Sequence, residues 1–286
     1  MKKSSEKTFD RAVFIGGPFE IWVGHRRSVF DTNKMHTHEH CELVVYTEGR
    51  KSVFVNDSVY ISERGCAFTF RPGEGHFGLH RRGEYHERYV LNFSPRCLDT
   101  IPGGASLFRC FFERETGENN MIVMPEEETA ECFRLLDRMI ETGYGDLPER
   151  QSLMLADFIR CMSLFDRYYM SGLRRGGDVM PELLGGMIRY IDENLTSRLK
   201  VADISRRFGV SVATTERLFC GTLLMTPTRF IFMRRIERSK KLLIGGASVT
   251  EACYGSGFSD YSHYIADFRR ETGMTPARYR GEKTDV

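Results

Sequence analysis

VADISRRFGVSVATTERLF, residues 201–219, and VTEACYGSGFSDYSHYIADF, residues 249–268, follow one pattern. Each copy predicts a short helix, a turn that contains glycine, and a second helix. A Thr-Pro pair follows each copy, at Thr226-Pro227 and at Thr275-Pro276. A helix-turn-helix places its second helix in the major groove of DNA. Two copies on one chain can reach two successive groove segments, so the repeat predicts sequence-specific binding to double-stranded DNA.

The segment between the two copies predicts one long helix. Thr226 is a good N-cap and Pro227 suits the first helical position, and apolar residues then recur at helical spacing. A helix of roughly 18 residues is about 27 Å long at 1.5 Å per residue. That length approaches the ~34 Å helical repeat of DNA, so both copies can lie along one face of the duplex.

We call the two copies the first and the second reading head. Phe208, Leu218 and Phe219 anchor the first head, and Tyr264 and Phe268 anchor the second. The predicted outward residues of the recognition helices are Ala213, Glu216 and Arg217 in the first head, and Tyr261, Ser262, His263 and Ala266 in the second. We expect Arg234 on the connecting helix and Arg269 to bind phosphates.

Charge and composition agree with this interpretation and exclude several others. Residues 179–286 carry 17 Lys+Arg against 12 Asp+Glu, so the basic half of the chain is the half with the repeat. The eight cysteines form no C-x-x-C pair, which excludes common zinc and redox motifs. With neither an apolar leader nor an apolar run of 18 residues, we expect a cytoplasmic protein that does not span a membrane.

The first half of the chain predicts a β-domain followed by helices. Seven short apolar stretches between residues 11 and 93 predict strands of a sandwich or barrel, and residues 55–58 predict a hairpin turn. Helical periodicity follows, with Pro125 as the first helical residue and a second helix over about residues 148–170. This helical hairpin either covers the barrel or meets a second subunit. Residues 171–178 have the composition of a linker, which gives domains at 1–175 and 176–286.

His36, His38, His40 and Glu42 are the densest group of potential metal ligands. On a strand they share one face, and His76 follows in a turn. The spacing resembles the first motif of cupin barrels, although Phe30 replaces its leading glycine. The candidate metal ligands are His36, His38, Glu42 and His76. We nevertheless expect no bound metal or cofactor, and instead a pocket for a polar effector such as a carbohydrate, lined by Trp22, His36, His38, Glu42, Tyr46, His76 and Arg88.

The segment GFSDYSHYIADFRRETGMTPARYR, residues 257–280, resembles the signature of AraC/XylS-type transcription regulators, and the resemblance extends over about residues 181–280. It implies an α+β protein in which a cupin-like barrel with a helical hairpin senses an effector and mediates dimerisation. Its second half would be an all-α domain of two helix-turn-helix subdomains joined by a long helix. Relatives of this type bind direct or inverted half-sites and contact RNA polymerase to activate transcription.

The chain departs from the family pattern at three places. Thr215 replaces a usually buried leucine, Leu224 replaces the glycine of the first closing turn, and Ile265-Ala266 replaces small polar and arginine residues. An apolar reading face of this kind can still contact thymine methyl groups.

The sequence thus predicts a ligand-responsive transcription regulator that is not an enzyme. One alternative is a metal-dependent cupin enzyme fused to a DNA-binding domain. Another is a repair regulator that accepts alkyl groups on cysteine, although the chain lacks the clustered cysteines of such proteins.

Overall fold

The computed structural model describes residues 11–17, 19–28, 36–48, 51–56, 58–62, 64–79, 86–172 and 181–284. The chain forms two compact units that divide between Gly177 and Asp178. Among the described residues, no helix is both long and apolar enough to cross a membrane.

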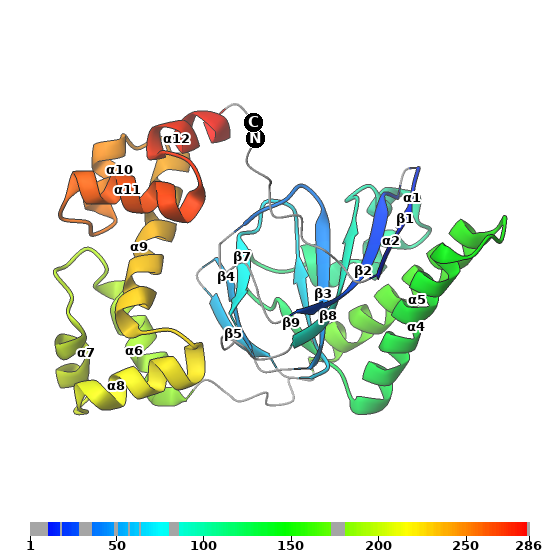
Figure 1. Ribbon diagram of the computed structural model, residues 1–286, viewed down its shortest axis with the longest axis horizontal. Helices are drawn as coiled ribbons and strands as arrows, with labels where there is room; N and C mark the ends of the chain where they lie inside the picture. Colours follow the sequence, from blue (N-terminus) through cyan, green and yellow to red (C-terminus); the bar gives the residue numbers. More distant parts are fainter. Residues whose placement is uncertain are drawn as a thin grey trace. The chain divides into compact units, whose positions relative to one another are not determined.

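The first unit contains two antiparallel sheets (Figure 1). The larger has the order β1-β2-β8-β3-β6-β9 and the smaller the order β5-β4-β7. A cluster that includes Val44, Val53 and Phe68 joins the two sheets. The strands are β1 (Arg11–Ile15), β2 (Ile21–Ser28), β3 (Cys41–Glu48), β4 (Lys51–Val55), β5 (Ser58–Ser62), β6 (Cys66–Phe70), β7 (His76–Leu79), β8 (His86–Phe93) and β9 (Met121–Val123).

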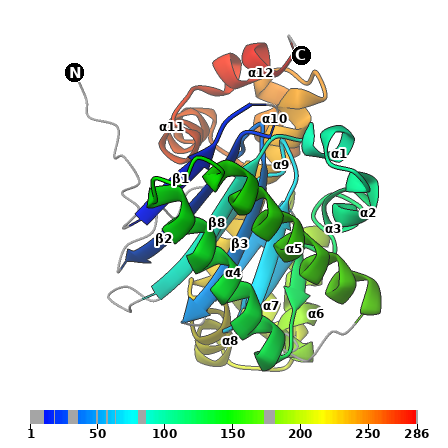
Figure 2. The same cartoon turned by 90° about the vertical axis from the view of Figure 1, so that its right-hand side faces the viewer.

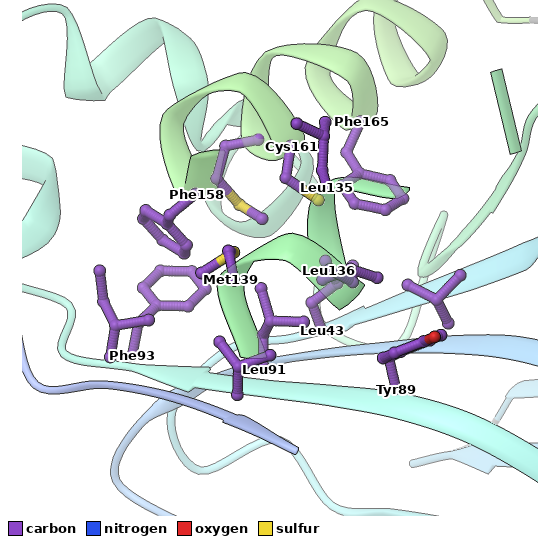
Figure 3. Packing of buried hydrophobic residues seen from close by; sticks show 14 of the residues in the cluster. Leu43, Tyr89, Leu91, Phe93, Leu135, Leu136, Met139, Phe158, Cys161 and Phe165 are labelled. Atoms are coloured by element: carbon purple, nitrogen blue, oxygen red, sulfur yellow. The ribbon is translucent and has the colours of Figure 1, made fainter. Parts of the chain in front are cut away.

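A pair of long helices, α4 (Glu126–Tyr144) and α5 (Arg150–Ser171), covers the other face of the larger sheet (Figure 2). Figure 3 shows Leu43, Leu91 and Phe93 of the sheet facing Leu136, Met139 and Phe158 of these helices. Phe93 packs its ring about 5 Å from those of Phe108, Phe111 and Phe158, at 5.1, 5.1 and 5.2 Å between centroids. Truncation of a residue like Phe93 to alanine costs about 3–5 kcal/mol.

The sequence predicted seven of these strands, the helical hairpin and the turn at Asn56, which has a left-handed φ of 48°. It missed β7, β9 and three short helices, α1 (Cys97–Thr100), α2 (Gly104–Leu107) and α3 (Arg109–Phe112). One detail was wrong, because Pro125 is the N-cap of α4 and not its first residue. Of the predicted linker, residues 173–178 lie outside the described residues.

The second unit consists of helices, as predicted. They are α6 (Glu182–Glu193), α7 (Val201–Arg207), α8 (Val212–Leu218), η1 (Phe219–Leu223), α9 (Pro227–Ile244), α10 (Val249–Gly255), α11 (Tyr261–Thr272) and α12 (Pro276–Thr284). The pair α7–α8 is the first reading head and α10–α11 the second, and Figure 1 shows α9 running from one to the other. The α+β fold class inferred from the sequence is therefore confirmed.

The connecting helix α9 begins as its sequence predicts. The Thr226 hydroxyl accepts a hydrogen bond from the Arg229 N–H at 3.2 Å, and Pro227 is the first helical residue. Apolar residues of α9, α10 and α11 then form one core that includes Ile236, Leu243, Cys253 and Phe268. Phe230 of α9 also packs against Phe219 of the first head, with 5.5 Å between ring centroids, so α9 contacts both heads.

Candidate ligand cavity and nucleic-acid interface

The first unit contains a cavity of about 350 Å³. Its lining includes every residue that the sequence predicted for an effector site: Trp22, His36, His38, Glu42, Tyr46, His76 and Arg88. These side chains come from β2, β3, β7 and β8 and from the segment before β3. Residues separated by up to 66 positions in the sequence therefore meet in one place.

Strand register explains why they meet. β3 pairs with β8 so that Glu42 lies opposite Asn92 and Tyr46 opposite Arg88. β2 pairs with β8 on its other side, and Trp22 is also opposite Asn92. Alternate residues of a strand share a face, so Arg88 and Asn92 point to the same side of the sheet. The alternation along β8 was the signal that could have identified Asn92, which the sequence prediction missed together with His40, Phe70 and Phe77.

The histidine cluster differs from its predicted geometry. Residues 37–40 are not part of a strand, so His36, His38 and His40 are not one regular row. His36 instead forms an isolated bridge with His76, with backbone N···O distances of 3.2 and 3.1 Å. The chain then bends before β3 begins at Cys41. The bend still directs His38 toward Glu42, and their Nε2 and Oε2 atoms are 2.5 Å apart.

Glu42 is the centre of this cluster. Its Oε2 atom also lies 2.9 Å from Nε2 of His76. Burial opposes ionisation of Glu42, but the contacts from His38 and His76 hold the pKa of its carboxyl group well below the ordinary value. A buried, ionised carboxylate among imidazoles is therefore the electrostatic core of the cavity.

A buried ion pair supports the loop that carries His76. The Glu74 carboxylate accepts hydrogen bonds from both terminal nitrogens of Arg114, at 2.8 and 2.6 Å. It also accepts bonds from the backbone N–H of Gly117 at 2.7 Å and from the Asn120 amide at 3.1 Å. Burial opposes ionisation of Glu74, but these donors lower its pKa. Since both partners are fully enclosed, the network fixes the position of residues 71–76.

A second cluster lies on the helix-facing side of β8. His25 is buried, stacks on Tyr89, and places Nε2 at 2.6 Å from Glu87. Glu87 also accepts a hydrogen bond from Arg27 at 2.9 Å. Burial opposes ionisation here too, while Arg27 and then His25 lower the pKa of Glu87.

The first recognition helix, α8, displays the residues predicted from the repeat. Ser211 is its N-cap and accepts a hydrogen bond from the Thr214 N–H at 3.1 Å. Ala213, Glu216 and Arg217 are exposed, while Phe219 is buried. The unexpected Thr215 is fully buried, and its hydroxyl is 2.8 Å from that of Ser205. This polar pair joins α8 to α7 where the family pattern has a leucine.

The second recognition helix, α11, is capped by Asp260, whose carboxylate accepts a hydrogen bond from the His263 N–H at 2.8 Å. Tyr264 is buried at the position that matches Thr215, four residues after the cap, and bonds Ser239 at 2.6 Å. The exposed face carries all four predicted residues and the predicted phosphate ligand: Tyr261, Ser262, His263, Ala266 and Arg269.

Three arginines of α9 are paired inside the protein. Arg234 is only 8% exposed and pairs with Asp192 of α6 at 2.6 Å, so its assignment to a phosphate-binding surface is wrong. Arg235 donates hydrogen bonds to the carbonyls of Leu195 and Ser197. Arg238 donates to the Gly255 carbonyl. These arginines hold α6 and α10 against α9.

The turn of the second head fits against this same region. A Cβ atom at Gly257 would lie 2.0 Å from the Leu195 carbonyl oxygen, and its φ is 93°. Only glycine satisfies both conditions without moving the backbone. The turn glycine thus fixes α10 and α11 next to the end of α6.

Comparisons with known proteins match both units. A model of an AraC-like ligand-binding domain matches residues 25–156, and a helix-turn-helix domain model matches residues 204–282. The thermoregulatory protein LcrF of Yersinia pestis is 30% identical over 77% of this chain and 85% of its own length. The transcriptional activator RhaS of Escherichia fergusonii is 24% identical, covering 86% of each chain. The solved structure of ToxT from Vibrio cholerae is 13% identical over 91% of this chain and 97% of that chain, with a TM-score of 0.37. The chain belongs to the AraC family of transcription regulators.

Proposed function

We propose that the protein is a ligand-responsive, sequence-specific activator of transcription that binds double-stranded DNA through both recognition helices. The observation that carries this proposal is the pair α8 and α11, each with a capped N-terminus and an exposed face, anchored on one continuous helix. An activating role is supported by relatives that are themselves transcriptional activators, such as RhaS.

The effector binds in the cavity between the sheets of the first unit. Hydrogen-bonding groups such as Arg88 and Asn92 stand beside the aromatic rings of Trp22 and Tyr46, a mixture suited to a small carbohydrate. Binding shifts the equilibrium toward the DNA-binding arrangement because the effector has different affinities for the two arrangements. The protein acts in the cytoplasm as a homodimer, contacts RNA polymerase, and has no catalytic activity of its own.

Trp22→Ala tests the effector site. A panel of sugars and sugar acids is screened by thermal shift, and any hit is then added to a DNA-binding assay with the wild-type protein. We expect a hit to change the DNA affinity of the wild-type protein but not that of Trp22→Ala. Phe14→Ala is the matched control, because Phe14 is an exposed aromatic residue on β1 that does not line the cavity.

Two results decide against the proposal. If ligand response survives Trp22→Ala unchanged, the effector binds elsewhere. If neither variant nor wild type prefers any DNA sequence, the regulatory function itself is wrong.

A further inference from the structure

We propose that a second, polar cavity of the first unit binds a small zwitterion of the amino-acid class, with Arg11 as the partner of its carboxylate and Asp137 and Glu141 as partners of its ammonium group. The cavity has a volume of about 450 Å³, within the range of about 300–1,000 Å³ for small-molecule sites. Among the described residues, it shares none of its lining with the proposed effector cavity. The proposal therefore goes beyond the proposed function.

Alternation along the strands places one wall of this polar cavity on the helix-facing side of the larger sheet. Tyr89, Leu91 and Phe93 of β8 point toward the long helices (Figure 3), and Glu87 continues the same face beyond them. Arg27 of β2 is opposite Glu87. The polar cavity thus begins where the apolar packing under α4 ends.

Helix α4 supplies the opposite wall. Phe133, Asp137 and Glu141 follow one another at intervals of four residues, so they lie on one face of the helix. The Tyr89 hydroxyl donates a hydrogen bond to Oδ1 of Asp137 at 2.7 Å. Burial and this contact raise the pKa of Tyr89, so the hydroxyl keeps its proton and orients the carboxylate. Among the described residues, that carboxylate makes no other hydrogen bond, which leaves Oδ2 available to a ligand.

Thr47 gives independent evidence for a bound molecule. It is only 8% exposed and lines the cavity, yet its hydroxyl has no hydrogen-bond partner among the described residues. Strand β3 carries an extra residue here, because Tyr46 is opposite Arg88 while Glu48 is opposite Glu87. Such β-bulges redirect side chains and are frequent next to active sites. A buried hydroxyl without a partner is costly, and a polar ligand atom would satisfy it.

The charges of the lining favour a ligand that carries both signs. They come from three arginine and four acidic side chains. Arg27 already pairs with Glu87 at 2.9 Å, and Arg64 with Glu126 at 3.3 Å. A simple anion would face the carboxylates, and a metal ion would face the guanidinium groups. A molecule with one carboxylate and one ammonium group can pair with both kinds of side chain.

Arg11 and Glu141 are the charges most available to such a ligand, since neither forms an ion pair with a described residue. Against the larger effects of burial and of Asp137, the charge of Arg11 lowers the pKa of Tyr89, so its guanidinium lies close to the tyrosine that contacts Asp137. A guanidinium group binds a carboxylate through two parallel hydrogen bonds. We therefore assign Arg11 to the ligand carboxylate and the two acidic residues of α4 to the ammonium group.

Binding of free L-amino acids to the full chain tests the proposal. The common L-amino acids are screened by thermal shift, and isothermal titration calorimetry then measures the affinity of each hit. We expect at least one amino acid to bind with one-to-one stoichiometry. Its N-acetyl derivative lacks the positive charge and its amide lacks the negative charge, so each should bind at least about 10-fold more weakly.

Arg11→Gln and Glu141→Gln should each weaken binding by at least about 10-fold, because each removes one charged partner of the ligand. Thr47→Val keeps the shape of the side chain without its hydroxyl and should weaken binding by about 3–10-fold. The matched controls are Arg160→Gln and Glu127→Gln, since both residues are exposed on the long helices and neither lines the cavity. They should bind the amino acid like the wild type.

Trp22→Ala distinguishes the two cavities, because Trp22 lines only the proposed effector cavity. It should bind the amino acid as tightly as the wild type. The proposal is overturned if no amino acid binds, if a derivative with a single charge binds as tightly as the amino acid, or if Arg11→Gln or Glu141→Gln keeps the wild-type affinity. Loss of binding in Trp22→Ala would also overturn it. DNA affinity measured on the same samples reports separately on the proposed function.

Discussion

Leu224 closes the first reading head in the left-handed conformation that Gly273 adopts at the matching position of the second, with φ values of 60° and 83°. Both residues lie thirteen positions after the N-cap of the recognition helix, at Ser211 and Asp260. The backbone of the turn is therefore kept although its usual residue is lost, and the strain falls on a side chain with a Cβ atom. The left-handed conformation therefore belongs to this position of the turn, since leucine and glycine both adopt it there.

Leu224→Gly should stabilise the second unit. Removing the Cβ atom relieves about 1–2 kcal/mol of strain in the left-handed conformation. Glycine also makes the unfolded chain more flexible, which lowers the free energy of unfolding and offsets part of this gain. The net increase in stability should be about 0.5–1 kcal/mol. Urea unfolding of the second unit within the full chain measures the change. Leu242→Gly, in the right-handed helix α9, is the control and should destabilise by more than about 1 kcal/mol. A loss of stability in Leu224→Gly would mean that the leucine side chain matters more than the strain.

Arg217→Ala should weaken specific DNA binding by about 1–3 kcal/mol and relax the base preference at one position, because an arginine on a recognition helix typically reads guanine. Competition binding with single-base variants of the operator measures both effects. Arg207→Ala is the control, since Arg207 is exposed at the end of the supporting helix α7. An unaltered order of preference among operator variants would remove Arg217 from the reading face.

Arg269→Gln and Arg234→Met should behave differently even though both remove one positive charge. Exposed Arg269 should bind phosphate, so its loss weakens binding to all sequences and lowers the salt slope by about 1. Buried Arg234 pairs with Asp192, so its loss should lower stability and leave the salt slope of the folded protein unchanged. Salt titrations and thermal melts of both variants make the comparison. Equal salt slopes for the two would contradict the distinction.

Arg114→Leu should destabilise the first unit by about 3–5 kcal/mol, because it leaves the enclosed Glu74 carboxylate without its main partner. Replacing both residues, Arg114→Leu with Glu74→Leu, should recover part of the loss. Thermal denaturation of the three proteins measures it. If the double variant is less stable than Arg114→Leu alone, the hydrogen bonds of Glu74 with Gly117 and Asn120 stabilise the fold by more than its unpaired charge destabilises it.

The protein should lose stability as the pH is lowered, partly because the carboxylate of Glu87 becomes protonated. The pKa of Glu87 is lower in the folded chain than in the unfolded chain, so its contribution is complete above the unfolded value and is lost as the pH falls through the folded value. Glu87→Gln should therefore lose less stability than the wild type between about pH 6 and pH 3.5. Melting temperatures across that range test it, with exposed Glu39→Gln as the control. If the melting temperatures of the wild type and of Glu87→Gln fall in parallel as the pH is lowered, Glu87 does not contribute to the pH dependence of stability.

The features that the sequence predicted correctly are mainly those set by neighbouring residues. The cap at Thr226 and the length of α9 depend on local chemistry, so they could be recognised without the fold. Burial of Arg234 depends on Asp192, 42 positions away, and no local pattern reveals that pairing.

The cavity could be predicted from the sequence only in part. Residue type alone identified its polar and aromatic lining, but the contact of His76 with Glu42 depends on the bridge at His36 and on the network of Glu74 and Arg114. The missed β7 is a four-residue strand, too short for its alternation to be distinguished from the turn before it.

Selection of bound sequences from a random pool of duplex DNA tests the central claim most directly, because that claim is that both recognition helices read bases. We predict enriched sequences with two conserved blocks whose centres are about 10 base pairs apart, one for α8 and one for α11. Arg217→Ala should relax the block read by α8 and leave the other intact. A pool without enrichment, or with a single block that Arg217→Ala leaves unchanged, would contradict the account.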